Sequence, residues 1–282
     1  MDAPAAARYD AFVRAAARCA VAVDFDGTIA PIVDDPAAAH IHPDAVEAFL
    51  ALAPHVAALA VITGRPARQA LDLGGLEQLA HRAAAVGTPL LVFGQYGNER
   101  WSSSQPRIVS PRPPAGLASF ERELPRLLRT HDAAGAHLED KGLAVAIHTR
   151  RLPDAAAAFE RLRGPVQELA DRYGLVVEPG RQVLEVRSPG MDKGVAVRTL
   201  MADLDLDGLL YAGDDLGDLE AFHAVRALAD TGAPTLLVFS ASGEESALRD
   251  LADLSVPGPT GVVALLRRLA DDAQAAQAAA PA

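Results

Sequence analysis

The stretch Cys19–Thr28, CAVAVDFDGT, has an acidic turn directly after a short apolar run. The run itself, Cys19–Val23, is long enough for a strand that is buried on both faces. In an open parallel sheet, ligands bind beyond the carboxyl ends of the strands. Asp24 and Asp26 are therefore candidates for a functional site. Calcium loops also contain Asp-x-Asp-Gly, but here a strand precedes the string and Gly27 comes too early for an EF-hand.

Three further polar clusters stand where another strand ends or a helix begins. One follows the apolar run Ala58–Ile62, one opens a helix expected from Asp192 to Met201, and one follows the run Leu209–Ala212. In chain order the clusters are Thr63-Gly64-Arg65, Lys193, and Asp214-Asp215 with Asp218. Taken singly, they also fit a helix-entry turn, a solvated lysine and a helix cap. Their order and placement within one sheet favour a shared site.

These residue types suit phosphoryl chemistry on a metal ion. Carboxylates from two strand ends, with no His or Cys nearby, form a hard oxygen site of the kind that Mg²⁺ prefers. One aspartate can act as a nucleophile and form an aspartyl-phosphate. A second aspartate, two residues on, can protonate the leaving oxygen and then activate water. A lysine and a hydroxyl beside them would bind and neutralise the phosphoryl group.

Two breaks divide the chain. Strand and helix patterns alternate in its first and last parts, which indicates a parallel sheet with helices on both faces. Ser102–Pro114, rich in Ser, Pro and Arg, is typical of a linker, and Ser188–Gly190 is the second break. Between them the pattern is helix, hairpin, helix, hairpin. We expect an α/β core in two parts, 1–111 and 189–270, an inserted α+β domain, 112–188, and a flexible tail, 271–282.

Composition narrows the class of protein. The 282 residues are 50% hydrophobic and carry a formal net charge of −11. This charge argues against a protein built to bind nucleic acid or an anionic membrane, and no uncharged apolar window is long enough to span a bilayer. The N-terminal stretch lacks the apolar core of a signal peptide, and a single cysteine excludes an internal disulfide framework. A cytoplasmic protein is the resulting expectation.

Two lysines stand out among the 26 basic residues. They are Lys141 and Lys193, and all the others are arginines. Arginine and lysine differ in shape and hydration, because the guanidinium is a planar fork and the ammonium a compact point charge. In a chain that uses arginine wherever either cation would serve, the two lysines mark positions that favour the compact group.

The ordered strings DxDGT, TGR, K and GDDxxxD resemble the motifs of the haloacid dehalogenase superfamily of phosphohydrolases. The inserted domain resembles the C2-type cap of that superfamily, and within it the chain is most similar to trehalose-6-phosphate phosphatases. The stretches that carry the resemblance are Asp24–Ile32, Thr63–Arg65, Leu138–Gly142, Ile147–Arg150, Gly180–Val186, Asp192–Gly194 and Gly213–Asp218. The resemblance implies a Rossmann-like core with a parallel sheet and an α-β-β-α-β-β cap.

The resemblance also implies roles for the aspartates. Asp24 would be the nucleophile, and Asp26 the general acid and base. Mg²⁺ would be the cofactor, held by the Asp24 carboxylate, the Asp26 carbonyl and Asp214. Either Asp215 or Asp218 would support the metal ion.

Two groups of substrate contacts follow from the same resemblance. Thr63 and Lys193 would hold the phosphoryl group, and Gly64 and Arg65 would lie beside the substrate. In the cap, a Glu-x-Lys pair and a later Glu would bind the sugar hydroxyls. These three residues are Glu139, Lys141 and Glu185. From the residues alone, an ordinary cross-strand charge pairing on a solvated sheet face is favoured over sugar binding.

Two departures from the family pattern concern the substrate. Tyr96 replaces the His of a Gly-x-His-Gly string, and Leu219 replaces the Glu that ends GDDxTDE. We expect a Mg²⁺-dependent trehalose-6-phosphate phosphatase whose partner is a small sugar phosphate, with no nucleic acid, membrane or obligate protein partner. The alternatives are a phosphatase for another sugar phosphate, such as sucrose 6-phosphate or a glycosyl-phosphoglycerate, a non-catalytic sugar-phosphate sensor, and a phosphomutase.

Overall fold

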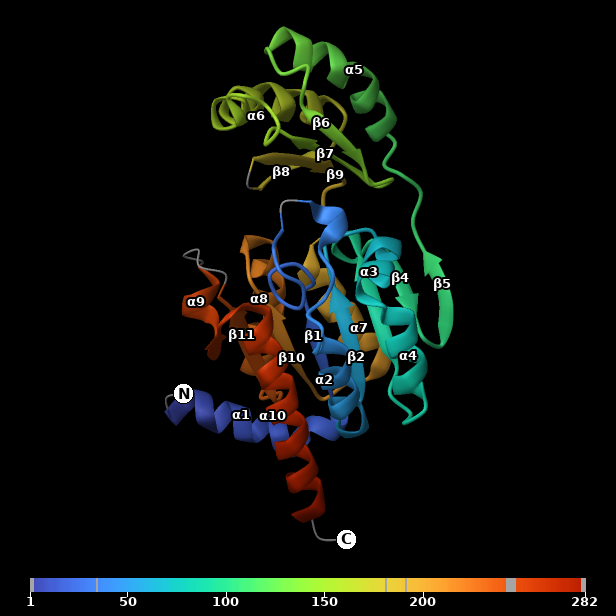
Figure 1. Ribbon diagram of the computed structural model, residues 1–282, viewed down its shortest axis with the longest axis vertical. Coiled ribbons are helices and arrows are strands. Elements are labelled where there is room, and N and C mark those ends of the chain that lie inside the picture. Colours follow the sequence, from blue (N-terminus) through green and yellow to red (C-terminus); the bar gives the residue numbers. More distant parts are fainter. Residues whose placement is uncertain (1–2, 34, 181, 191, 242–246, 280–282) are drawn as a thin grey trace. The chain divides into compact units, whose positions relative to one another are not determined.

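The computed structural model describes residues 3–33, 35–180, 182–190, 192–241 and 247–279. The chain forms two compact units (Figure 1). The first unit combines Met1–Ser110 with Asp192–Ala282, and the second is Pro111–Met191. We call them the core and the cap, and describe each by itself.

The core is built on one eight-stranded sheet with the strand order β12-β11-β10-β1-β2-β3-β4-β5. All neighbours from β12 to β3 pair in parallel, and β3-β4 and β4-β5 pair antiparallel. The strands are β1 Cys19–Val23, β2 Ala58–Ile62, β3 Leu90–Gly94, β4 Glu99–Ser102, β5 Gln105–Val109, β10 Gly208–Gly213, β11 Thr235–Ser240 and β12 Leu254–Val256. Strand order reverses at β1, which makes its carboxyl end the topological switch point where ligands bind in such sheets.

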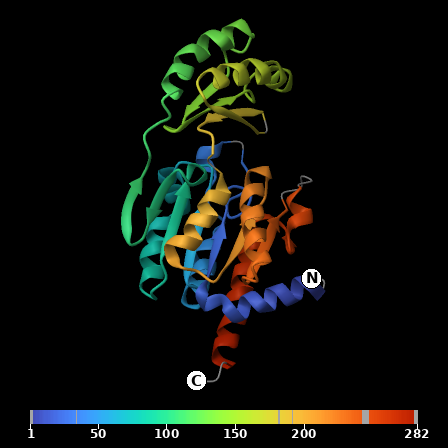
Figure 2. The ribbon, with the colours of Figure 1, turned by 180° about the vertical axis from the view of Figure 1, so that it is seen from behind.

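Helices cover both faces of this sheet, as Figures 1 and 2 show from opposite sides. One face packs against α1 Ala3–Ala15, α2 Ala45–Leu52, α3 Ala67–Gly74, α4 Leu76–Ala84 and α10 Gly258–Ala279. The other packs against α7 Lys193–Leu204, α8 Leu219–Asp230 and α9 Leu248–Leu251. In β1 the small side chains of Ala20 and Ala22 face the second group, and Val21 and Val23 face the first. The predicted α/β class with a parallel sheet is confirmed.

The cap is a four-stranded antiparallel sheet covered by two helices. The strand order is β6-β7-β9-β8, and the chain order is α5-β6-β7-α6-β8-β9. The elements are α5 Leu117–Thr130, β6 His137–Asp140, β7 Ala144–His148, α6 Ala155–Arg172, β8 Val176–Gly180 and β9 Val183–Arg187. Val145, Ile147, Leu184 and Val186 pack with the helices in one apolar cluster. The alternate residues of the same strands therefore form the other face of the sheet.

Two segments differ from the expectation. Within the predicted linker, Gln105–Val109 forms strand β5, because β4 pairs with it and Ile108 packs on the core. Helix α10 does not fray after Asp271 but runs on to Ala279. Its last turns are held because Asp272 accepts a 2.7 Å hydrogen bond from the Tyr9 hydroxyl and Ala273 is buried.

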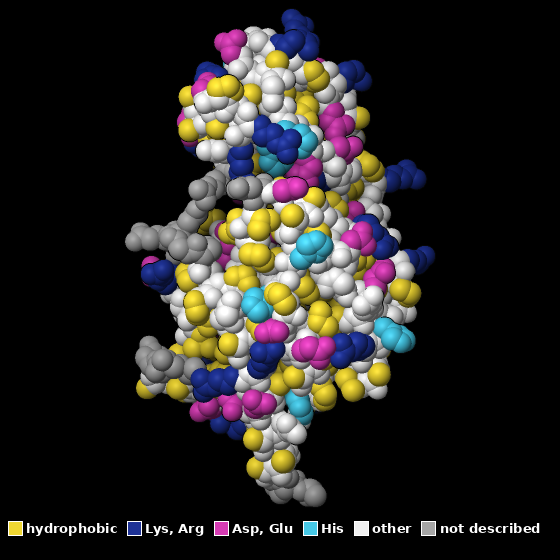
Figure 3. All heavy atoms as spheres, in the orientation of Figure 1, with side chains coloured by type: hydrophobic (Ala, Val, Ile, Leu, Met, Phe, Trp, Pro, Cys, Tyr) yellow, Lys and Arg dark blue, Asp and Glu magenta, His cyan; other side chains and the backbone are white. Residues whose placement is uncertain are grey.

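The surface carries acidic and basic side chains interspersed over the visible face of each unit (Figure 3). Among the described residues, no helix has both the length and the apolar character needed to cross a membrane.

Candidate active site

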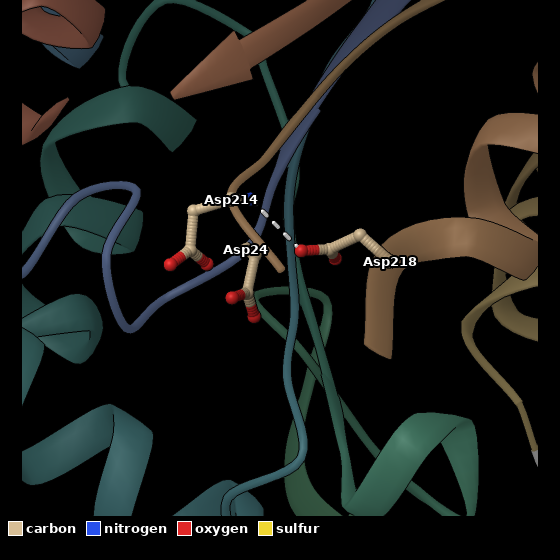
Figure 4. A group of neighbouring side chains, drawn as sticks. All are labelled: Asp24, Asp214 and Asp218. Carbon is tan, nitrogen blue, oxygen red and sulfur yellow. Dashed lines mark hydrogen bonds between the residues drawn. The ribbon is translucent and has the colours of Figure 1, made fainter. Parts of the chain in front are cut away.

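The strand ends of β1 and β10 bring two of the sequence motifs together. Val23 pairs with Ala212, and the Asp24 amide donates a 2.8 Å hydrogen bond to the Ala212 carbonyl. Asp24 and Asp214 thus leave neighbouring strands at the switch point. Figure 4 shows Asp24, Asp214 and Asp218 pointing into the same space. One carboxylate oxygen from each lies within 4.8 Å of the others.

Lys193 supplies the positive charge of this cluster. It is the first residue of α7, whose N-terminus is capped by Asp192 through a 2.9 Å bond from the Val195 amide. Its Nζ lies 2.7 Å from Asp24 Oδ1 and 2.8 Å from Asp218 Oδ1. Burial alone would lower the pKa of Lys193, but Asp218 and Asp24 outweigh it and hold that pKa above its usual value. The ammonium therefore stays charged.

Asp24 itself is buried, with 4% of its surface exposed. Burial raises the pKa of Asp24, Lys193 opposes this shift, and Asp218 adds to it. A buried carboxylate with raised pKa needs cations around it in order to act as an ionised nucleophile. Lys193 is one such cation.

Asp218 accepts four hydrogen bonds. Its Oδ1 receives Lys193 Nζ and, at 2.5 Å, the Tyr211 hydroxyl. Its Oδ2 receives the backbone amides of Asp214 at 3.0 Å and Asp215 at 3.4 Å. Donors thus occupy both oxygens of Asp218. This favours a role in holding Lys193 and the Asp214 backbone over a role as a metal ligand. Tyr211 was not singled out from the sequence, where it resembles any apolar strand residue.

The residues present fit a divalent cation between Asp24 and Asp214. Burial, followed by the charge of Asp24, raises the pKa of Asp214 to about 9. Two buried carboxylates, each with a raised pKa, are the hard oxygen donors that Mg²⁺ accepts. A Cβ at Gly27 would stand 1.9 Å from Asp214 Oδ2, so only glycine lets the DGT turn approach this close. Asp215 instead accepts the Gly217 amide at 2.8 Å and caps its own turn.

Asp26 is held by Arg65 in a two-pronged ion pair. Arg65 Nε and Nη2 each donate a 2.6 Å hydrogen bond to one oxygen of the Asp26 carboxylate. Arg65 Nη1 donates to the Pro36 carbonyl at 2.8 Å, and the guanidinium lies 5.4 Å from the centre of the Phe25 ring. The sequence had assigned Arg65 to the substrate. In the structure, Arg65 instead binds Asp26, the expected general acid and base. The spacing of the two residues along the chain does not reveal this contact.

Thr63 and Gly64 follow β2, the strand next to β1. Thr63 is 1% exposed, and its amide donates to the Phe93 carbonyl at 2.9 Å. Its Oγ1 accepts the Arg65 amide at 3.1 Å. The loop therefore has a fixed conformation at the same edge of the sheet as Asp24.

The three cap residues lie on the face of the cap sheet that the helices leave uncovered. Cross-strand pairing puts Glu139, Ala146 and Glu185 in one row. Lys141 forms an ion pair with Glu185, and Glu139 Oε2 lies 2.9 Å from His148 Nε2. The sequence analysis named these three residues but not their connection through His148.

An aspartate at the switch point of a parallel sheet, in contact with a buried lysine and beside an acidic turn, is the arrangement expected of the haloacid dehalogenase-like fold class. Comparison with solved structures agrees with this class. The chain matches the C. albicans trehalose-6-phosphate phosphatase C-terminal domain with a TM-score of 0.75 at 20% identity, over 95% of this chain and 96% of that one. It matches a haloacid dehalogenase-like hydrolase from Bacteroides thetaiotaomicron with a TM-score of 0.60 at 16% identity, over 89% and 98%.

Sequence comparison narrows the class. The profile of the family described as Trehalose-phosphatase matches residues 127–257. A trehalose-phosphate phosphatase of Mycobacterium marinum is 32% identical over 74% of this chain and 52% of its own length. An uncharacterized glycosyl hydrolase of Mycobacterium tuberculosis is 34% identical over 92% of this chain and 19% of its own length.

The chain thus matches the trehalose-phosphatase family over residues 127–257, and it shares the fold of the solved structures named above. It spans about a fifth of the hydrolase and about half of the phosphatase that it matches.

Proposed function

We propose that this chain is a Mg²⁺-dependent phosphatase that hydrolyses trehalose 6-phosphate to trehalose and phosphate through an aspartyl-phosphate. The observation that carries the proposal is the buried contact of Asp24 with Lys193, 2.7 Å long, beside Asp214 at the switch point. The names of the relatives in the family support the choice of substrate.

The reaction divides into two steps between Asp24 and Asp26. In the first, Asp24 Oδ attacks phosphorus and the bond from phosphorus to the sugar oxygen breaks. Asp26, which must first leave its ion pair with Arg65 and take up a proton, gives that proton to the sugar oxygen. In the second, Asp26 takes a proton from water, the water oxygen attacks phosphorus, and Asp24 is released as phosphate leaves. Bound Mg²⁺, held by Asp24, the Asp26 carbonyl and Asp214, would supply charge neutralisation.

Lys193 and the Thr63-Gly64 loop bind the phosphoryl group in this proposal. Lys193 has three N–H groups, and two of them point at Asp24 and Asp218. The third is suited to a phosphoryl oxygen. An ammonium fixed by two carboxylates needs no rearrangement as negative charge shifts during the reaction, which is how preorganised groups lower barriers.

The cap residues Glu139, Lys141 and Glu185 bind the sugar hydroxyls in this proposal. Carboxylates accept hydrogen bonds from hydroxyls, and an ammonium donates them, so ion pairs on one sheet face can exchange partners for a sugar. Lys141 and Glu185 are mostly buried, with side chains 14% and 9% exposed.

A phosphatase for a different sugar phosphate is the second candidate, because Tyr96 and Leu219 depart from the family pattern. A sensor without turnover is less consistent with an intact Asp24, Asp26 and Lys193. The test is a phosphate-release panel with Mg²⁺ that compares trehalose 6-phosphate, sucrose 6-phosphate, glucose 6-phosphate and glucosyl-phosphoglycerate. The proposal requires the highest kcat/KM for the first. A higher value for any other substrate would replace it with the second candidate.

A further inference from the structure

A short turn after β3 is attached to the Thr63-Gly64-Arg65 loop. The turn is a single 3₁₀ segment, Gln95–Gly97. The Gln95 amide donates to the Arg65 carbonyl at 2.8 Å, and the Tyr96 amide donates to the Thr63 carbonyl at 2.9 Å. The two bonds bracket Gly64 on either side. The turn thus fixes the backbone of the loop that follows β2.

This turn has an unfavourable backbone conformation. Gln95 and Tyr96 have φ values of 47° and 59°, two consecutive non-glycine residues in the left-handed region. Each such residue costs about 1 kcal/mol, and strain of this kind clusters at functional sites. The turn is closed by Asn98, whose Nδ2 donates to the Gln95 carbonyl at 3.0 Å. A glycine at either position would remove this cost, so the side chains themselves must contribute something.

The Tyr96 ring lies against Gly64. A Cβ added to Gly64 would stand 2.9 Å from both Cζ and the hydroxyl oxygen of Tyr96 and 3.2 Å from Cε1. The ring therefore covers the α-carbon of Gly64 directly. On its other side the turn meets α7, where a Cβ at Gly97 would come within 3.0 Å of the Ala196 Cβ. The turn is packed between the loop after β2 and the helix that begins with Lys193.

One amide of the loop is left without an acceptor. The Thr63 amide donates to Phe93, and the Arg65 amide donates to Thr63 Oγ1. Within the part of the chain that the structure describes, the Gly64 amide has no acceptor. A fixed backbone amide that follows β2, the strand paired with β1 before Asp24, lies at the carboxyl edge of the sheet and is suited to an anion.

We propose that Tyr96 is a positioning residue that holds the Gly64 amide in place to bind the phosphoryl group. The Tyr96 side chain packs on the α-carbon of Gly64, and the Tyr96 amide binds the Thr63 carbonyl, which belongs to the same peptide unit as the Gly64 amide. Tyr96 therefore sets the direction of the Gly64 amide without itself contacting the substrate. The inference rests on the proposed function only for the identity of the anion, a phosphate. It concerns phosphate binding and is independent of which sugar is attached.

Isothermal titration of inorganic phosphate in the presence of Mg²⁺ tests this role, together with kcat and KM for a small aryl phosphate. Tyr96→Leu removes the ring and keeps the left-handed backbone. We expect phosphate binding to weaken about 10-fold, as for the loss of one charge-assisted hydrogen bond. KM for the aryl phosphate should rise by a similar factor, with kcat within about threefold of its original value. Tyr96→Phe, which keeps the ring on Gly64, should restore both values.

Asp205→Gly is the matched control. Asp205 has a φ of 49° at the C-terminus of α7, so glycine relieves the same kind of strain away from the loop. It should leave phosphate binding unchanged. Tyr96→Gly relieves strain and removes the ring, and should bind phosphate as weakly as Tyr96→Leu.

Two results would overturn the inference. One is unchanged phosphate affinity in folded Tyr96→Leu. The other is a loss confined to the sugar phosphate with a normal aryl phosphate KM, which would make Tyr96 a sugar contact. A wild-type protein that binds phosphate and hydrolyses aryl phosphate, but does not prefer trehalose 6-phosphate, would refute the proposed substrate and leave the role of Tyr96 open to the same measurement.

Discussion

The edge of the core sheet that carries Asp24 and the uncovered face of the cap sheet both have charged groups, but they arrange them differently. In the core, one ammonium serves two carboxylates, and the side chains of Lys193, Asp24 and Asp218 are 4%, 6% and 0% exposed. In the cap, Lys141 forms an ion pair with Glu185, and His148 Nε2 contacts Glu139 Oε2. The side chains of His148 and Glu139 are 20% and 29% exposed. The core cluster shares one ammonium and is closed, whereas the cap residues are more exposed.

Substitutions in the two regions should therefore affect different properties of the protein. Removing one member of a buried, shared cluster leaves an uncompensated charge, so substitutions there should affect the chemical step and the stability together. Pairs near the surface are weaker and can exchange partners with a ligand. Substitutions in the cap should therefore affect substrate binding and leave the chemical step intact. The predictions below test this separation, from the largest expected effect to the smallest.

Asp24→Asn should give the largest effect. The amide cannot attack phosphorus, so kcat for every phosphate ester should fall by about 10⁴-fold or more, as for removal of a nucleophile. The fold should persist at reduced stability, because Asn has nearly the same volume and Lys193 keeps its ion pair with Asp218. Steady-state phosphate release together with circular dichroism gives both readouts. Retained turnover in a folded variant would exclude the aspartyl-phosphate route.

Lys193→Met should lower kcat by about 100-fold for sugar and aryl phosphates alike, because the ammonium neutralises the nucleophile and the phosphoryl group. It should also lower the free energy of unfolding by roughly 3 kcal/mol, since Asp24 and Asp218 lose their shared partner. Lys193→Arg should be harmful as well, because a planar guanidinium does not fit the two contacts. Kinetics and thermal melts measure these effects. A variant with normal kcat would show that the closed arrangement of the core is not needed for chemistry.

Lys141→Ala should act on substrate binding alone. We expect KM for trehalose 6-phosphate to rise about 10-fold, equivalent to the loss of one good hydrogen bond to a charged group. A small aryl phosphate has no sugar hydroxyls, so its kcat/KM should stay within about twofold of the original. Lys141→Arg should also be harmful for the sugar phosphate. Equal losses on both substrates would place Lys141 outside the sugar site and remove the contrast between the two regions.

The sequence alone predicted the fold class because its signals are local. A five-residue apolar run before Asp24, and the four-residue run Leu209–Ala212 shortly before Asp214, are enough to indicate buried parallel strands with acidic ends. The pattern did not reveal β5, since Gln105–Val109 contains Pro and Arg and is a strand only because β4 pairs with it. Likewise, the end of α10 is alanine-rich and looks free to fray, but Asp272 binds Tyr9 from the other end of the chain.

The candidate site was less predictable than the fold because its contacts join distant segments. Motif spacing identified Asp24, Lys193 and Asp214, all of which come together at one edge. It could not identify Tyr211, whose role depends on a hydroxyl reaching Asp218 across a buried space. Nor could it show that Arg65 forms an ion pair with Asp26. The two residues follow different strands, and their contact depends on the side-chain conformations.

The pH dependence of stability should give the smallest effect and involves Asp214. Its pKa is raised from 3.8 in the unfolded chain to about 9 in the folded, metal-free protein. Between these values the folded form binds the extra proton, so this stabilising contribution is complete below about pH 4 and lost as pH rises through 9. Without metal, Tm should fall by roughly 5 °C between pH 6 and pH 9.5, and Asp214→Asn should reduce the slope. Excess Mg²⁺ should also flatten the profile, because the cation replaces the proton. Thermal melts with EDTA or Mg²⁺ measure this, and a metal-free Tm that is constant or rises over this range would show that Asp214 is ionised without a cation.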